Sequence, residues 1–215
     1  MKAELRTTCS AGAVLNDLTL QQTILRFFAM VVIIGVHGFA VAGAAIALGD
    51  PGPRHDGRLR VSPLSHLDLL GLAAGIFFSI GWIKPIAIDD KALRIWRIAL
   101  VVVAPAVALI AVIVVLRLMR PFLLPLLSDT WSMLVFALID TIGQLGIWFG
   151  LANLLPIPPF TGSHLAAALF PQWRETLRRS HIYAAILFVA IGITGIMTRT
   201  LEPVYRMIAQ IVLGD

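Results

Sequence analysis

Any chemistry in this chain would depend on a few histidine and aspartate side chains that lie in or beside apolar segments. They are His37, His66, Asp68, Asp140 and His164. Imidazole and carboxylate groups ligate zinc and transfer protons, and an ionisable group inside a membrane segment is a functional candidate because its charged form is costly there. Three of them converging would form a displaced zinc site. No two have the H-x-x-x-H spacing that puts two ligands on one helix face, so the spacing favours structural histidines.

A break in an apolar helix is the best candidate for a binding groove. Residues 151–165 read LANLLPIPPFTGSHL, in which an amide precedes three prolines and a glycine. The prolines end the helix and leave carbonyl groups without partners, which lipid tolerates only where they face protein or a water-filled cavity. The predicted groove residues are Asn153, Pro156, Pro158, Pro159 and Gly162.

The same break carries a family resemblance. Residues 153–162, NLLPIPPFTG, resemble the N-x-x-P-x-P-x-L-D-G signature of the site-2 proteases, intramembrane zinc metalloproteases in which the aspartate is a zinc ligand. That family carries H-E-x-x-H on an earlier helix, and residues 37–41, HGFAV, are similar to it. The corresponding positions here are His37, Gly38, Val41 and Thr161. The resemblance therefore implies one zinc ligand of three and no general base.

Three further segments resemble the same family in the same order. Residues 57–71, GRLRVSPLSHLDLLG, are similar to its G-R-L-T-L-N-P-L-A-H-L-D-P-L-G segment, and residues 81–88, GWIKPIAI, to G-W-A-K-P-V-P-V. Residues 103–108, VAPAVA, take the place of A-G-P-L-A-N, with alanine instead of the glycine and the asparagine. The resemblance covers roughly residues 18–165 and implies a site-2 protease-like core in a bacterial cytoplasmic membrane.

The missing residues decide the expected function. Loss of the base alone removes proton transfer worth about 10²–10⁴-fold. We predict a catalytically inactive member of the family, without a cofactor, that binds another integral membrane protein or a larger membrane complex as an accessory subunit or regulator. One alternative is an active or rewired intramembrane zinc metalloprotease. A second is a small transporter or channel with a polar path through His37, Asp140 and Gln144.

The polar intramembrane residues also have structural interpretations. Asp140 and Gln144 lie four residues apart and so share a helix face. A protonated Asp140 bonded to Gln144 or to a neighbouring helix is therefore the alternative to a functional acid. For His37, the alternative to metal ligation is a packed side chain bonded to a backbone carbonyl.

The composition excludes several classes of protein. With 59% hydrophobic and 13% charged residues in 215, the chain is too apolar for a soluble globule and is expected in the lipid bilayer. Its net charge of +5 comes from arginine-rich connections, as in loops beside an anionic leaflet, so no nucleic-acid partner is expected. Cys9 is the only cysteine, which rules out an internal disulfide. Residues 1–19 read as a tail rather than a signal peptide.

The apolar segments predict an all-α integral membrane protein with about five membrane helices, between four and six. The predicted helices are residues 20–48, 67–83, 95–119, 131–155 and 182–198, in one membrane domain over 20–198, followed by an interfacial helix over 199–215. His37 and Thr161 can meet only if their helices run parallel, so the segment 67–83 must be short or re-entrant. Short pieces around 57–61 and 85–88 are candidates for membrane-edge strands.

Overall fold

The computed structural model describes residues 18–60, 62–89 and 93–214, so the predicted tail with Cys9 lies outside the described residues. The elements are α2 (Leu20–Ala47), α3 (Gly52–His55), η1 (Pro63–Ser65), α4 (Leu69–Phe78), α5 (Ile95–Leu123), η2 (Leu124–Leu126), α6 (Asp129–Asn153), α7 (Ser163–Leu169), η3 (Pro171–Trp173), α8 (Arg174–Arg179), α9 (His181–Thr194) and α10 (Ile196–Val212). The predicted all-α fold is confirmed, because these elements are all helical.

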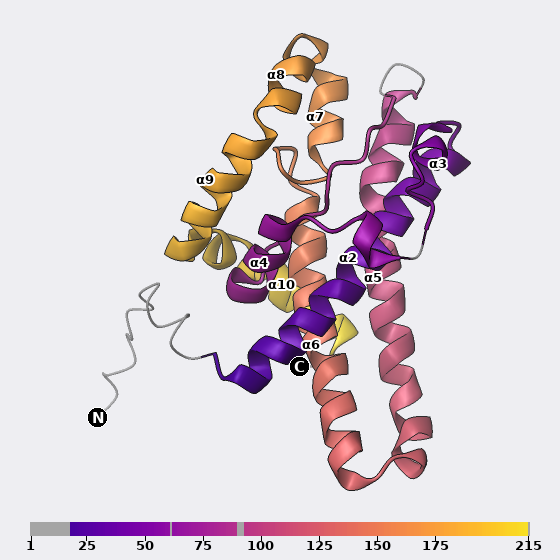
Figure 1. The fold of residues 1–215 in the computed structure, drawn as a ribbon, viewed down its shortest axis with the longest axis vertical. Helices are drawn as coiled ribbons and strands as arrows, with labels where there is room; N and C mark the ends of the chain where they lie inside the picture. Colours follow the sequence, from indigo (N-terminus) through magenta and orange to yellow (C-terminus); the bar gives the residue numbers. More distant parts are fainter. Residues whose placement is uncertain (1–17, 61, 90–92, 215) are drawn as a thin grey trace.

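Helices α2, α5 and α6 form the centre of the molecule and are long and apolar enough to cross a membrane. Figure 1 shows that α2 and α6 run in the same direction and that α5 runs antiparallel to both. The consecutive helical segments Pro171–Arg179 and His181–Thr194, bent by 68°, make a fourth span if they count as one. Four spans is the lower end of the predicted range. The protein is therefore built to contact a lipid bilayer.

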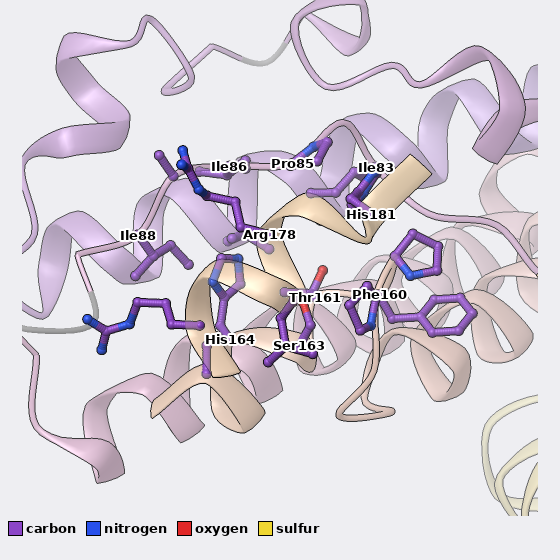
Figure 2. A pocket seen from close by; sticks show the side chains of 17 residues that line it. Ile83, Pro85, Ile86, Ile88, Phe160, Thr161, Ser163, His164, Arg178 and His181 are labelled. Atoms are coloured by element: carbon purple, nitrogen blue, oxygen red, sulfur yellow. The ribbon is translucent and has the colours of Figure 1, made fainter. Parts of the chain in front are cut away.

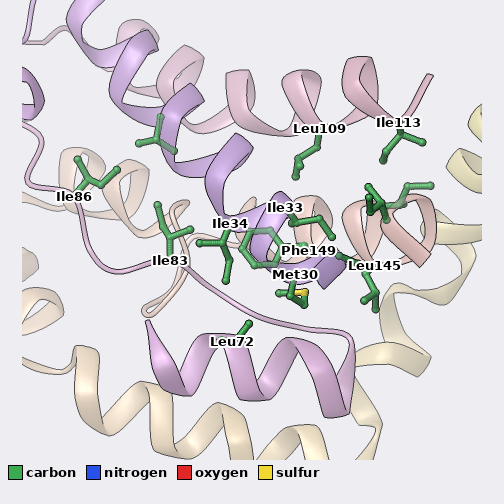
Figure 3. Close-up of a cluster of buried hydrophobic side chains, with 14 of the residues drawn as sticks. Met30, Ile33, Ile34, Leu72, Ile83, Ile86, Leu109, Ile113, Leu145 and Phe149 are labelled. Atoms are coloured by element: carbon green, nitrogen blue, oxygen red, sulfur yellow. The ribbon is translucent and has the colours of Figure 1, made fainter. Parts of the chain in front are cut away.

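The three long helices enclose an apolar core, which forms because small and branched side chains of α2 face the other two helices. Ile33 and Ile34 of α2 lie against Leu109 and Ile113 of α5 and Phe149 of α6 (Figure 3). All five are almost fully buried. The start of α2 is defined by a capping box, in which the side chain of residue 19 and that of residue 22 bond each other's backbone.

Helix α4 is the short element that the parallel arrangement of α2 and α6 requires. It has 10 residues, about 15 Å of rise, which is half of a hydrocarbon core. Asp68 caps its start by accepting a hydrogen bond from the backbone N–H of Gly71, and Ser79 ends it in a left-handed conformation with φ of 63°. Arg26 of α2 donates to the carbonyl oxygen of Ile76 at 2.7 Å and so ties the end of α4 to the core.

The predicted membrane-edge strands do not form in the described residues of 57–61 and 85–88, which are irregular. One backbone hydrogen bond joins this region to the preceding loop, from the N–H of Lys84 to the carbonyl of His66 at 2.8 Å. Pro85 has no N–H to continue a ladder. Arg58 instead bonds the carbonyl oxygens of Ser65 and Pro85 with its side chain.

The last two helices pack on the core. Helix α9 has 14 residues and contacts α4, and Gly195, with φ of 66°, turns the chain into α10. The stacked rings of Trp148 and Tyr205, with centroids 4.4 Å apart, join α10 to α6. Ala209 is buried there, whereas Ile211 remains exposed. The segment predicted as an interfacial helix thus covers part of α6 with one face.

Candidate functional site

The site is built around a hydrogen bond between residues 124 positions apart in the sequence. Nε2 of His37, on α2, lies 3.0 Å from Oγ1 of Thr161, in the loop after α6, and both residues are buried. The loop after α6 lies beside α2 ten residues before that helix ends, which brings the two positions together as the sequence predicts. These are two of the positions that correspond to zinc ligands in the site-2 proteases.

Asn153 fixes the direction of every hydrogen bond in this site. Its Nδ2 donates to the carbonyl oxygens of Gly81 and Phe149, both at 2.9 Å, so its Oδ1 must face Thr161. The hydroxyl of Thr161 donates to that Oδ1 at 3.3 Å. Because a hydroxyl has one hydrogen, Thr161 can only accept from His37, and the proton of the neutral imidazole sits on Nε2. A chain of hydrogen bonds thus runs from Nε2 of His37 through Thr161 and Asn153 to the carbonyl oxygen of Gly81, and only Nδ1 of His37 lacks a partner in it.

His66 fills the space beside Gly38, the position that corresponds to the general base. A Cβ atom added to Gly38 would lie 2.6 Å from Cβ of His66 and closer still to two atoms of its ring. His66 has no exposed surface, and its Nε2 lies 3.2 Å from the carbonyl oxygen of Arg60. Its backbone carbonyl accepts from Lys84. A side chain larger than hydrogen at position 38 therefore requires that this loop move.

A cavity of about 350 Å³ opens beside Thr161 (Figure 2). Val41, residues 83 and 85–88, and the loop residues Pro158, Pro159 and Phe160 form its apolar walls. Its polar lining consists of Thr161, Ser163, His164, Arg174, Arg178 and His181. Burial lowers the pKa of His164 to about 4, so this imidazole is neutral at physiological pH.

The predicted groove residues divide into two groups. Pro158 and Pro159 line the cavity, whereas Asn153, Pro156 and Gly162 do not. Gly162 instead closes the helix break, since a Cβ there would lie 2.6 Å from the carbonyl oxygen of Leu154. The break therefore contributes two of its three prolines to the cavity, and its asparagine and glycine hold the loop in place.

The residues present do not fit a zinc ion with three protein ligands. Within the described ranges, no three His, Cys, Asp or Glu side chains come together in a group that could hold a metal ion. At the family's ligand positions Val41 is apolar, Thr161 is a hydrogen-bond donor, and Nε2 of His37 carries its proton. Asp68 caps a helix, which takes it out of a displaced metal site as well.

Asp140 does not bond Gln144, and neither residue lies in the cavity beside Thr161. The carboxylate of Asp140 binds Arg117 and Arg120 of α5, and Gln144, one turn further along α6, is exposed. Asp140 lies 13 residues before Asn153, or about 20 Å along α6. The cavity beside Thr161 includes neither residue, nor His37. The three residues of the predicted transport path thus do not share this cavity.

Sequence reasoning missed two parts of the site. The placement of His66 against Gly38 depends on packing between the loop and α2, which no local pattern indicates. Arg178 and His181 form one wall of the cavity, although neither belongs to a motif that the sequence shows. Both residues follow the proline-rich break within about 20 positions, and this short separation is the feature of the sequence that could have indicated a contact with it.

Comparison with known proteins finds a relative that is similar over most of the chain. The chain is 28% identical over 184 residues to a protein of Bacillus subtilis (strain 168) named "Putative zinc metalloprotease YwhC", which covers 81% of this chain and 82% of that protein. The similarity suggests a site-2 protease-like family. No family model matches the chain, and no solved structure matches it. The apolar helices and this relative together indicate a metalloprotease-like membrane protein.

Proposed function

We propose that this chain is a site-2 protease-like pseudoenzyme of a bacterial cytoplasmic membrane, which binds a segment of another membrane protein without cleaving it. The observation that carries the proposal is the bond between His37 and Thr161. In this bond, Nε2 of His37 carries a proton and donates it to the hydroxyl of Thr161. A metal ion would need a lone pair on that nitrogen. The second ring nitrogen, Nδ1, is buried without a hydrogen-bond partner in the described residues, so Nε2 alone ties the imidazole to the loop.

The surroundings of the bond also oppose hydrolysis. A metalloprotease needs a carboxylate beside the first histidine to take a proton from water. Gly38 stands at that position, and His66 occupies the adjacent volume. Val41, at the second histidine's position, is 1% exposed and packs in the apolar core. These side chains stabilise the packed core, and none of them supplies a metal ligand or a general base.

The cavity supports binding of an extended peptide. Ile86 and Ile88 lie in an irregular, extended stretch that forms one wall, and within the described chain their backbone N–H and C=O groups have no hydrogen-bond partner. Such a free edge is where peptides add as a further strand, with side chains entering adjacent pockets. The cavity volume is within the range of small binding sites, about 300–1,000 Å³. A partner segment therefore finds both backbone partners and an apolar pocket.

The test is purification of the full chain in mild detergent, followed by identification of co-eluting membrane proteins. Ala87→Trp fills the cavity from an exposed position, and Val107→Trp, on the lipid-facing side of α5, is the matched control. We expect the companions to disappear only with Ala87→Trp. A lone protein, companions indifferent to Ala87→Trp, or cleavage of a membrane peptide by the pure chain would each contradict the proposal.

A further inference from the structure

This inference rests on the proposed binding function and specifies its ligand. We infer that the bound segment carries a carboxylate side chain, which lies against Arg178 and His181 on the α8–α9 wall of the cavity. The two walls of the cavity differ in chemistry, and that difference sets the orientation of the peptide.

The wall formed by residues 83–88 is apolar, with Ile83, Ile86 and Ile88 facing the cavity (Figure 2). The opposite wall carries Arg178 and His181, and Figure 2 shows both side chains beside the same space. No aspartate or glutamate of the described chain lines the cavity. A ligand in this space therefore meets positive charge on one side without a compensating acid from the lining.

Arg178 is only partly neutralised by its own helix. Its Nε and Nη2 contact Glu175 at 3.0 and 3.1 Å, but the same carboxylate also binds Nε of Arg179 at 2.6 Å. One acid thus serves two guanidinium groups, and Glu175 is the only acidic residue in α8. A second carboxylate beside Arg178 restores the balance of charge and forms charge-assisted hydrogen bonds.

His181 adds a ring nitrogen at the same wall. Its Nε2 is buried and has no hydrogen-bond partner within the described residues, and the nearby Asp68, outside the lining, acts on the ring only through its charge. It is the first residue of α9, whose unbonded N–H groups and helix dipole favour a negative group. In the tautomer with its proton on Nε2, this nitrogen is a buried donor without a partner, and a ligand carboxylate at this point removes that cost.

The negative group beside Arg178 could be a peptide carboxylate or a lipid phosphate. The unpaired backbone groups of Ile86 and Ile88 favour the peptide. Backbone N–H and C=O groups in an extended stretch are matched by another backbone, whereas an acyl chain leaves them unpaired. An apolar peptide with one acidic side chain satisfies both walls at once. We therefore assign the site to an acidic residue within an otherwise apolar segment.

The experiment measures binding of fluorescent Val/Ala decapeptides to the full chain in detergent by anisotropy. Three sets carry one Glu, Gln or Lys at each central position. We expect the best Glu peptide to bind about tenfold more tightly than its Gln partner, with Lys weakest. Arg178→Gln should reduce the ratio of Glu-peptide to Gln-peptide affinity to about one. Arg206→Gln, which pairs with Glu202 and does not line the cavity, should retain the ratio.

The outcomes separate this inference from the proposed function. Equal affinity for the three sets, blocked by Ala87→Trp, overturns the inference and leaves peptide binding in place. Absence of binding by every peptide overturns the proposed function itself. Binding of spin-labelled phosphatidylglycerol, dependent on Arg178 and without peptide binding, replaces the peptide by an anionic lipid and overturns both.

Discussion

Gly38 of α2 and His66 of the following loop share a single space, in which a Cβ atom on one would overlap the ring of the other. The contact joins the segment 57–66 to the core at the position where a protease of this kind needs its base. It determines what substitutions the site accepts.

Gly38→Ala should lower stability by about 1–3 kcal/mol, because the added methyl group overpacks a site with no free volume. The measurement is the thermal unfolding midpoint in detergent. Adding His66→Ala to Gly38→Ala should restore part of the loss, so the two substitutions should be non-additive. An unchanged midpoint for Gly38→Ala alone would show that the loop moves freely.

Restoring zinc should require four substitutions rather than three. Gly38→Glu, Val41→His and Thr161→Asp rebuild the family's ligands and base, but the glutamate collides with His66. Adding His66→Ala makes room for it. Metal analysis of the purified variants should show zinc near one equivalent only with all four, and below about a tenth without any. Equal zinc in the triple and quadruple variants would refute the role of His66.

Thr161→Val should destabilise the protein by about 1–3 kcal/mol, because it leaves the Nε2 proton of His37 buried without a partner and leaves Oδ1 of Asn153 only the backbone N–H of residue 161, at 3.4 Å. Valine has nearly the same shape, so the loss reports on the hydroxyl. Thr161→Ser keeps the hydroxyl and is the control, with a smaller loss expected. Equal losses for both would mean that the methyl group matters and the hydrogen bonds do not.

Stability should fall below about pH 6.5 because of His164. Its pKa is near 4 in the folded chain and near 6.5 when unfolded, so the unfolded state binds the proton first as the pH falls. The loss should grow between pH 6.5 and 4 to about 3 kcal/mol and be absent at neutral pH. His164→Gln should flatten this part of the pH profile, and His55→Gln, at an exposed position, should not.

The sequence predicts the features that depend on one segment at a time or on the order of the motifs along the chain. Long apolar runs predict helices because length and hydropathy act within one segment. The order of the motifs predicts that His37 and Thr161 meet, since parallel helices follow from it. The partner of Asp140 is not local: Arg117 and Arg120 lie on α5, and their charges are indistinguishable in sequence from those of a loop. The contact of His66 with Gly38 likewise depends on packing between distant segments.

The arginines of α5 also set where a bilayer fits around the protein. Arg97 bonds the carbonyl oxygen of Leu48 at one end, and Arg117 binds Asp140 near the other. Twenty residues separate the two arginines, which is about 30 Å of helix and equals the thickness of the acyl-chain layer. We therefore expect the headgroup layers to lie near these guanidinium groups. The turn from α5 to α6 exposes Leu124, Leu126 and Trp131 beyond Arg117, so we expect it to rest in the interface between acyl chains and water.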